Sequence, residues 1–332
     1  MANPDFEIRR HILVGDTADI FLQRAMTILR NENINPVVVL EFSSSQKGIF
    51  CGISEVKSLL GKILPETGSE AWALEEGEDV GANEVALRIT APYGSLGLYE
   101  TAISGILSSN TGWASAARDC VNAADGIPVV TLSASRVHPD VSATVDYASI
   151  MGGCVSCSTT QGARLAGVTP SGNMSHGLAL LMSDTVTAMK AFDKHMPHEV
   201  PRVAIVDTFK DEAEESLNVA RALKEKLRGV RLDTPKERGG VTIGLVKEIR
   251  SRLDQAGFDH VETMVSGGFT PDKIGEFVEA NAPVNVFGVG SFIANSSPHQ
   301  YSANICEIDG RAVGKRGRIP GVTVNSRLIR IM

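Results

Sequence analysis

The chain has 332 residues, of which 43% are hydrophobic and 21% charged, and its formal net charge at neutral pH is -7. This length and composition suit a globular protein with one large core or two domains. The negative charge works against binding to nucleic acid or to an acidic membrane surface, and no apolar run in the sequence is long enough to span a bilayer.

The cysteines predict no disulfide framework. There are five of them, and only Cys154 and Cys157 lie close together in the sequence. This pair has no second pair nearby to complete a metal site, so we interpret both cysteines as buried small residues. The first ten residues are mixed and charged and do not resemble a signal peptide. We therefore expect a cytoplasmic protein.

The first part of the chain mixes helices and strands without a regular order. The apolar spacing of residues 15–30 predicts a helix with Asp16 or Thr17 as its N-cap. Strands are expected at 36–42, 48–53 and 85–92, and helices at 54–64 and 98–124. We therefore predict a separate domain over residues 1–112, to which the strand-like tail, residues 300–332, returns.

From Ile127 onward, apolar runs alternate with amphipathic helical segments. The expected strands lie at 127–131, 150–155, 168–171, 202–206, 230–232, 260–265 and 284–287, and the clearest helices at 211–227, 242–256 and 271–280. About seven strands with intervening helices predict an α/β domain built on a parallel array, an α/β barrel, over residues 113–299.

Two glycine-containing turns follow the last two predicted strands, and these turns predict a phosphate site. The first is Ser266-Gly267-Gly268, and the second runs from Gly288 through Gly290 to Ser291. In α/β barrels, phosphate usually binds at the loops after the last two strands, where glycine lets backbone amides approach oxygen closely. The alternative, that these are ordinary tight-turn glycines, stays open.

Charged or ionisable residues follow four other predicted strands. Asp207 and Asp233 each come directly after an apolar run, where a carboxylate would face the mouth of a barrel. The alternative for both is N-capping of the next helix. Arg231 would point away from Leu232, either to pair with a carboxylate or to reach phosphate. Arg136 and His176 also follow predicted strands, and for each a plain structural role is the alternative.

Together these segments resemble the nicotinate phosphoribosyltransferase family, one of the type II phosphoribosyltransferases, which also include the quinolinate enzymes. The similarity covers nearly the whole chain in order. It rests on the segments Gly15–Phe21, Tyr99–Thr101, Ser133–Pro139, Met151–Cys154, Gly172–His176, Val206–Glu212, Val230–Pro235, Ser266–Gly268 and Phe287–Ser291. No single segment is decisive, but their shared order and spacing is specific.

The resemblance implies an N-terminal α/β sandwich domain followed by an incomplete, open α/β barrel. It also implies an enzyme of NAD biosynthesis or salvage that makes nicotinate mononucleotide and pyrophosphate from nicotinate and phosphoribosyl pyrophosphate. Mg²⁺ would accompany the pyrophosphate, and ATP would serve as a co-substrate, which would make the enzyme an ATP-coupled ligase as well. The partners would be these small molecules and a second copy of the chain in a homodimer with shared active sites, with a higher oligomer left open.

The resemblance also assigns roles to individual residues. His176 would be the phosphorylated histidine that couples ATP hydrolysis, Asp207 and Asp233 would face the ribose and the Mg²⁺-pyrophosphate, and Arg136 would lie where base and pyrophosphate meet. Phe21, with Asp19 beside it, would stack on the pyridine ring of the neighbouring subunit's site. The remaining expected substrate-binding residues are Arg231, Ser266, Gly267, Gly268, Gly288, Gly290 and Ser291.

Three alternatives remain open. A quinolinate phosphoribosyltransferase must bind two carboxylates, and we disfavour it because the segment around Arg136 contains few cationic residues. The chain also departs from the family pattern at residues 133–136 and 173–175, which leaves room for a diverged, non-catalytic protein. The third alternative is a phosphate-binding barrel that acts on a different substrate.

Overall fold

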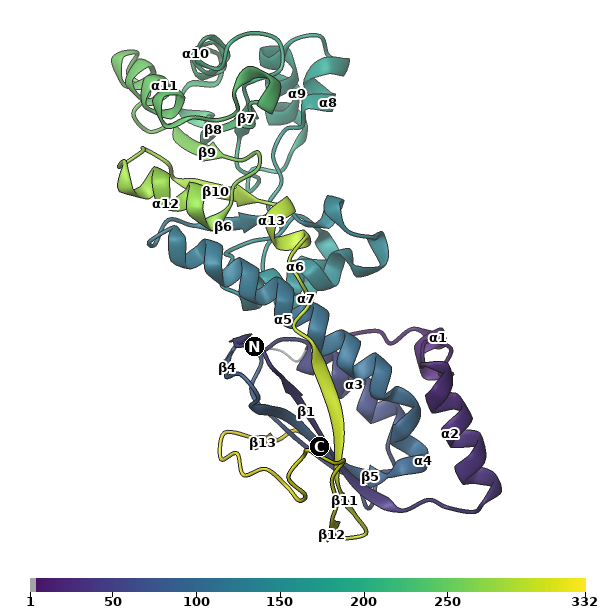
Figure 1. The fold of residues 1–332 in the computed structure, drawn as a ribbon. Coiled ribbons are helices and arrows are strands. Elements are labelled where there is room, and N and C mark those ends of the chain that lie inside the picture. The colour runs from purple at the N-terminus through teal and green to yellow at the C-terminus, as the bar shows by residue number, and fades with distance from the viewer. Residues whose placement is uncertain (1–3) are drawn as a thin grey trace. The chain divides into compact units, whose positions relative to one another are not determined.

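The computed structural model describes residues 4–332, and the chain divides into two compact units. The first unit contains the residues up to Ala116, the short segment Arg164–Gly167 and the C-terminal segment Ser296–Met332. The second unit contains Ala117–Ala163 and Val168–Asn295. Each unit has a sheet of its own (Figure 1). Within residues 4–332, no helix has the length and hydropathy that a bilayer crossing requires.

The first unit is built on a six-stranded sheet in the order β12-β11-β1-β5-β3-β13, with every neighbouring pair antiparallel. Its strands are β1 (Val37–Ser44), β3 (Glu70–Ala73), β5 (Val85–Pro92), β11 (Tyr301–Ile308), β12 (Arg311–Ala312) and β13 (Ile329–Arg330), and a separate pair is formed by β2 (Gly48–Ile49) and β4 (Asp79–Val80). Strand β11 runs along β1, with Val38 opposite Ile308 and Ser44 opposite Tyr301. The end of the chain therefore completes a sheet that its beginning starts.

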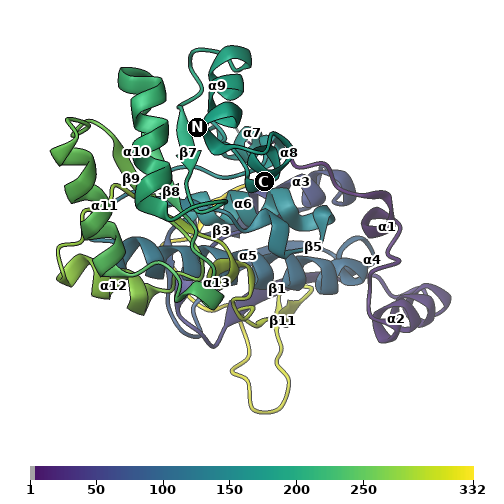
Figure 2. The ribbon, with the colours of Figure 1, turned by 90° about the horizontal axis from the view of Figure 1, so that it is seen from above.

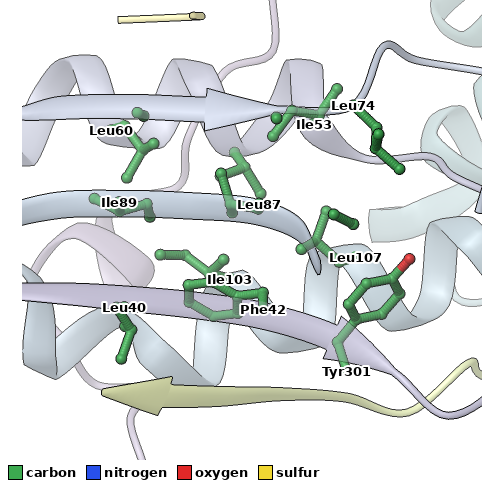
Figure 3. Close-up of a cluster of buried hydrophobic side chains, with 14 of the residues drawn as sticks. Leu40, Phe42, Ile53, Leu60, Leu74, Leu87, Ile89, Ile103, Leu107 and Tyr301 are labelled. Atoms are coloured by element: carbon green, nitrogen blue, oxygen red, sulfur yellow. The ribbon is translucent and has the colours of Figure 1, made fainter. Parts of the chain in front are cut away.

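The helices of this unit are α1 (Arg10–Leu13), α2 (Ile20–Asn31), α3 (Ile53–Ile63), α4 (Tyr93–Leu96) and α5 (Glu100–Ala123), the last of which runs on into the residues of the second unit. Of these, α3 and α5 cover the sheet because they bury apolar stripes against it. In Figure 3, Ile53 and Leu60 of α3 and Ile103 of α5 lie against side chains of the strands. Phe42 of β1 and Leu87 of β5 are completely buried there. This two-layer packing is the core of the first unit.

The second unit contains a five-stranded, wholly parallel sheet in the order β6-β10-β9-β8-β7. Its strands are β6 (Val129–Thr131), β7 (Val203–Ile205), β8 (Gly229–Leu232), β9 (Glu262–Val265) and β10 (Val286–Val289), and its helices are α6 (Ser142–Met151), α7 (Thr160–Ala166, which ends in the short segment of the first unit), α8 (His176–Leu181), α9 (Thr185–His195), α10 (Glu212–Leu223), α11 (Ile243–Gln255), α12 (Pro271–Glu279) and α13 (Ser291–Ala294). Figure 2 shows α10, α11 and α12 along one side of these strands. The predicted fold class, an N-terminal sheet domain with an open, barrel-like α/β domain, is confirmed.

Two of the seven predicted barrel strands are wrong. Ile150 lies in α6, because the apolar run there is the buried end of a helix, and the Gly152-Gly153 turn follows. Residues 168–171 form no strand either. What remains of a sixth strand is one isolated bridge, in which Ser156 lies parallel to Val130 of β6. The prediction that the neighbouring Cys154 and Cys157 are buried is confirmed, with exposures of 4% and 0%.

The core of the first unit makes one stability prediction. Phe42→Ala should lower the free energy of unfolding by about 3–5 kcal/mol, because it leaves a cavity among completely buried side chains. Ile319→Ala is the matched control, since Ile319 is 93% exposed, and it should change the free energy by less than about 0.5 kcal/mol. Denaturant unfolding followed by circular dichroism measures both values. Equal effects of the two substitutions would contradict this description of the core.

Candidate active site

The second unit gathers its polar side chains at one edge of the sheet. In a parallel sheet, all strands end at the same edge, so residues that follow different strands become neighbours. Asp207 follows β7, Asp233 follows β8, Ser266 follows β9 and Gly290 follows β10. The structure thereby brings together residues that are more than 80 positions apart in the sequence.

Arg231 connects the side chains at this edge of the sheet through hydrogen bonds. Its guanidinium donates hydrogen bonds from Nε to Ser266 Oγ (2.9 Å), from Nη1 to Asn173 Oδ1 (3.2 Å) and from Nη2 to Asp233 Oδ2 (3.2 Å). Ser266 Oγ in turn donates to Asp233 Oδ1 at 2.9 Å. The sequence left two partners open for Arg231, a carboxylate or phosphate, and the structure shows the carboxylate.

The capping alternative for the two aspartates is not what the structure shows. Helix α10 is capped by Asp211, whose side chain accepts from the backbone N–H of Glu214. Helix α11 is capped by Thr242. Asp207 and Asp233 are therefore left with no capping role at these helices, and both face the common edge.

His176 stands at the start of α8 and turns its ring toward the same edge. Its Nδ1 lies 3.1 Å from Thr208 Oγ1, and its Nε2 lies 3.8 Å from a carboxylate oxygen of both Asp207 and Asp233. The interaction with Asp233, and then the charge of Asp207, raises the pKa of His176 above its ordinary value, although burial acts in the opposite direction. The cationic form of this imidazole is thus more stable than that of a free histidine.

Asp207 is a buried carboxylate that accepts no hydrogen bond from another described residue. Its side chain is only 1% exposed, and both of its oxygens lack a partner within residues 4–332. Burial, followed by the nearby charges of Asp233 and Glu212, raises its pKa to about 6 in spite of His176. A buried, unpartnered acceptor of this kind is a feature of sites that bind a ligand.

Asp233 has the opposite electrostatic character. Burial alone would raise its pKa, but His176, Arg231 and the Ser266 hydroxyl together lower the pKa below its ordinary value. Asp233 is therefore ionised throughout the physiological range. Of the two carboxylates near the His176 imidazole, Asp207 is therefore the more readily protonated and Asp233 the one that stays ionised.

The two glycine turns have backbone conformations that need glycine or leave room only for it. Gly267 and Gly268 have φ values of +94° and +72°, so two successive amides lie in the left-handed region. A Cβ on Gly267 would stand 3.1 Å from Asp233 Oδ1, and one on Gly290 would stand 2.8 Å from the carbonyl oxygen of Leu132. Adjacent amides in such turns can form an anion-binding concavity. Gly288 is equally crowded, and Ser291 begins α13.

Three of the residues predicted for the site lie elsewhere in the sequence and the fold. Arg136 lies in the short 3-10 helix Ala134–Arg136 after β6, with its side chain exposed. Asp19 and Phe21 belong to the first unit, where Asp19 accepts a hydrogen bond from Thr101 (2.8 Å) and Phe21 is 64% exposed. Their roles remain predictions.

Sequence reasoning missed four residues that shape the edge. Thr208 contacts His176, Asn173 contacts Arg231, and Glu215 accepts the backbone N–H groups of Phe209 and Lys210 (2.9 and 3.1 Å). The Cε of Lys236 lies 3.7 Å from the place of a Cβ on Gly268. Thr208 and Asn173 lie within the segments that carried the family resemblance, whereas Glu215 and Lys236 lie outside them, and nothing in their spacing distinguished any of the four from ordinary helix and loop residues.

The protein does not by itself form a metal centre at this edge. Within the described part of the chain, no group of three or more histidine, cysteine, aspartate or glutamate side chains is arranged to hold a metal ion. Asp207 and Asp233 therefore do not make up a complete magnesium site.

Comparison with known proteins decides the family. Residues 19–111 match the model of the quinolinate phosphoribosyl transferase N-terminal domain, and residues 113–302 match that of the C-terminal domain of the same enzyme. The chain belongs to the quinolinate phosphoribosyl transferase family.

Individual relatives agree with this family. The solved structure of nicotinate-nucleotide pyrophosphorylase from Pyrococcus furiosus is 35% identical, has a TM-score of 0.87 and is aligned over 97% of this chain and 82% of its own. The enzyme of the same name from Ehrlichia chaffeensis shares the fold, with 15% identity, a TM-score of 0.69 and coverage of 90% of this chain and 100% of its own.

A curated nicotinate phosphoribosyltransferase of Mycobacterium tuberculosis is 31% identical over 69% of this chain. The alignment covers 49% of that protein, so the chain spans about half the length of this curated relative.

The resemblance to the nicotinate phosphoribosyltransferase family was therefore the wrong assignment, and so were the reaction, the ATP co-substrate and the ligase activity that it implied. The quoted motifs were assigned to the phosphoribosyl group, which is common to the nicotinate and quinolinate reactions, so those motifs do not identify the base. The geometry also opposes a phosphorylated His176. A phosphoryl group on its Nε2 would add negative charge where two carboxylate oxygens already lie at 3.8 Å.

The buried Asp207 makes a prediction about stability and pH. Because its folded-state pKa is about 6 rather than the ordinary 3.8, ionisation of this group opposes folding, and the cost is fully present above pH 6. Asp207→Asn should therefore raise the melting temperature at pH 7.5, and the gain should shrink as the pH is lowered through 6. Asp259→Asn is the charge-matched control at an exposed carboxylate. A gain that is independent of pH would contradict the assignment.

Proposed function

We propose that this chain transfers the phosphoribosyl group of phosphoribosyl pyrophosphate to quinolinate. The match to the quinolinate family over both domains supports this reaction. The relatives named nicotinate-nucleotide pyrophosphorylase supply the expected products, the nicotinate nucleotide and pyrophosphate. Quinolinate carries one carboxylate more than nicotinate, so in the balanced reaction the bond from the ring to that carboxylate breaks, CO₂ leaves, and the ring carbon takes up a proton.

One structural observation carries the proposal. The Arg231–Asp233–Ser266 network lies directly beside the left-handed turn Gly267-Gly268, so fixed charges and free amides are near one another. A sugar phosphate needs such an arrangement, with amides for the 5′-phosphate and a carboxylate for the ribose. A side chain at position 267 would crowd the Asp233 carboxylate, so the turn and the carboxylate can lie this close only with glycine there.

The chemistry needs electrostatic stabilisation more than proton transfer. The pyridine nitrogen is already nucleophilic, so its attack on C1 of the ribose requires no general base. As the bond from C1 to the pyrophosphate oxygen breaks, the sugar acquires positive charge and the leaving group carries negative charge. Asp233, whose pKa is lowered, is suited to stabilise the sugar cation, while Arg231 and His176, whose pKa is raised, are suited to the anionic groups.

The cations for a dicarboxylate come from several loops. The sequence argument against quinolinate considered only the segment around Arg136. In the folded chain, Arg231 from β8 and His176 from α8 belong to one cluster, and Lys236 lies against the Gly268 turn. We infer that these groups, rather than one basic segment, receive the two carboxylates and the phosphates.

Loss of the Asp233 carboxylate should be severe. Asp233→Ala should reduce turnover by more than about 100-fold, because the developing sugar cation loses its fixed negative partner. Glu214→Ala, at an exposed carboxylate bonded to Lys210, should keep wild-type turnover. Pyrophosphate release measures both. Wild-type turnover in Asp233→Ala would remove this residue from the mechanism.

The substrate is tested directly by a parallel assay of quinolinate, nicotinate and nicotinamide, each with phosphoribosyl pyrophosphate and Mg²⁺ but without ATP. We expect pyrophosphate and CO₂ in equal amounts with quinolinate. Release of pyrophosphate with nicotinate alone would reject quinolinate as the substrate, and no release with any of the three would reject the enzymatic function.

We also propose that the protein forms a homodimer through α2. This helix exposes three apolar side chains, Ile20, Phe21 and Ile28, at 57%, 64% and 61%. Such a cluster on one helix favours contact with another apolar surface. Light scattering should give the mass of two chains, and the double variant Phe21→Ser with Ile28→Ser should give the mass of one. An unchanged mass would exclude this helix from the interface.

A further inference from the structure

Helix α10 lies beside the candidate active site but contributes no residue to the cluster of His176, Asp207 and Asp233. Its first turn nevertheless contains two almost completely buried carboxylates, Glu212 and Glu215, each 3% exposed. Burying a glutamate is costly unless hydrogen bonds compensate. The partners of these two groups therefore indicate why the carboxylates are there.

Glu215 binds the loop that follows β7. Its Oε1 accepts from the backbone N–H groups of Phe209 (2.9 Å) and Lys210 (3.1 Å), and its Oε2 accepts from Thr185 Oγ1 (3.0 Å). The Thr208 N–H also points to Oε2, at 3.5 Å. One carboxylate thus holds the three residues that come directly after Asp207.

Glu212 binds the loop that follows β8. Its Oε1 accepts the hydroxyl of Thr234 at 2.8 Å, and Thr234 is the residue directly after Asp233. The side chain of Arg238 lies 3.8 Å from the other oxygen. Glu212 and Glu215 are three residues apart and so lie on the same face of the helix.

We propose that the first turn of α10 is the positioning element of the active site, in which Glu215 holds the loop that carries Asp207 and Thr208, and Glu212 holds the loop that carries Asp233. Neither glutamate touches the reacting atoms in this scheme. Both act through the residues that do, which makes them positioning residues. This inference rests on the proposed phosphoribosyl transfer, but part of its test does not.

The surroundings explain why the loop after β7 needs such an anchor. A partly open pocket of about 170 Å³ lies beside it, lined by Phe209 and Lys210 of the loop, by Glu215 itself and by residues of the neighbouring helices such as Val186 and Asn218. Without the Glu215 carboxylate, three backbone N–H groups lose their acceptor and the loop has space to move into. A displacement of about 1 Å at a catalytic group is enough to cost about 100-fold in rate.

The variants Glu215→Ala and Glu215→Gln test the proposal. Alanine removes all the acceptors, whereas glutamine keeps one oxygen for Phe209 and Lys210. We expect kcat to fall about 100-fold in Glu215→Ala with KM values within about three-fold of wild type, and glutamine to restore part of the loss. The matched control is Glu214→Ala, which removes the neighbouring but exposed glutamate of the same turn and should keep the wild-type kcat.

A second readout does not depend on turnover. The pH titration of the His176 ring by NMR reports on the groups that face it, which are Asp233, Asp207 and Arg231. In Glu215→Ala, the loop with Asp207 and Thr208 should move away, so the pKa of His176 should fall toward its ordinary value. Glu214→Ala should titrate as wild type. Glu212→Gln provides the corresponding test for the loop after β8.

The outcomes are separable. A folded Glu215→Ala protein with wild-type kcat and a wild-type His176 titration overturns the proposal. If Glu215→Ala does not fold, Glu215→Gln decides, and unchanged values of both measurements again overturn it. If the wild-type protein turns over none of the pyridine substrates, the proposed function fails, while the titration still supports or rejects the positioning role.

Discussion

The candidate active site depends on the Arg231 guanidinium, which donates hydrogen bonds to three neighbouring side chains. Arg231 lies on β8, one strand in from the edge of the sheet, and donates to a serine that follows β9, to an aspartate that follows β8 and to Asn173 in the segment before α8. Its side chain is 17% exposed, so these charge-assisted bonds are shielded from water. Because each donor points to a different segment, movement of any one of them would leave a largely buried charge without a partner.

This constraint has an electrostatic consequence. Arg231 and His176 keep Asp233 ionised, while Asp207, which lies in the same cluster without a hydrogen-bond donor, is much closer to protonation at neutral pH. Asp207 therefore has two oxygens that accept no hydrogen bond, and Asp233 carries a negative charge at neutral pH. Folding does not require this arrangement, since a buried carboxylate without a partner destabilises the native state. Such a loss of stability is common at sites that bind a ligand.

The correction from a nicotinate to a quinolinate family has a similar physical basis. The residues that carried the resemblance were assigned to a ribose and its phosphate, and these parts of the substrate are the same in both reactions. The groups that would receive a second carboxylate come from separate loops, as His176, Arg231 and Lys236 do, and they have no common sequence motif. Motifs assigned to the sugar phosphate therefore could not distinguish quinolinate from nicotinate, and the choice of nicotinate was wrong.

The sequence by itself determined the parts that depend on local periodicity. The strand at 85–92 has the bounds that its alternation predicts, and the helices predicted at 242–256 and 271–280 are α11 and α12 to within a residue at each end. Strand-end positions also predicted the aspartates, the serine and the glycines of the edge. The two lost strands, around Ile150 and Val168, failed because a short apolar run suits a buried helix end as well as a strand.

Only the tertiary structure decided which of these residues meet. The partners of Arg231, the contact of Thr208 with His176, and the support of two loops by Glu212 and Glu215 all join positions that no local pattern links. A buried glutamate in a helical first turn has the same sequence signature as an exposed one such as Glu214. Its role is fixed by which backbone amides lie across from it, and the sheet brings those amides there.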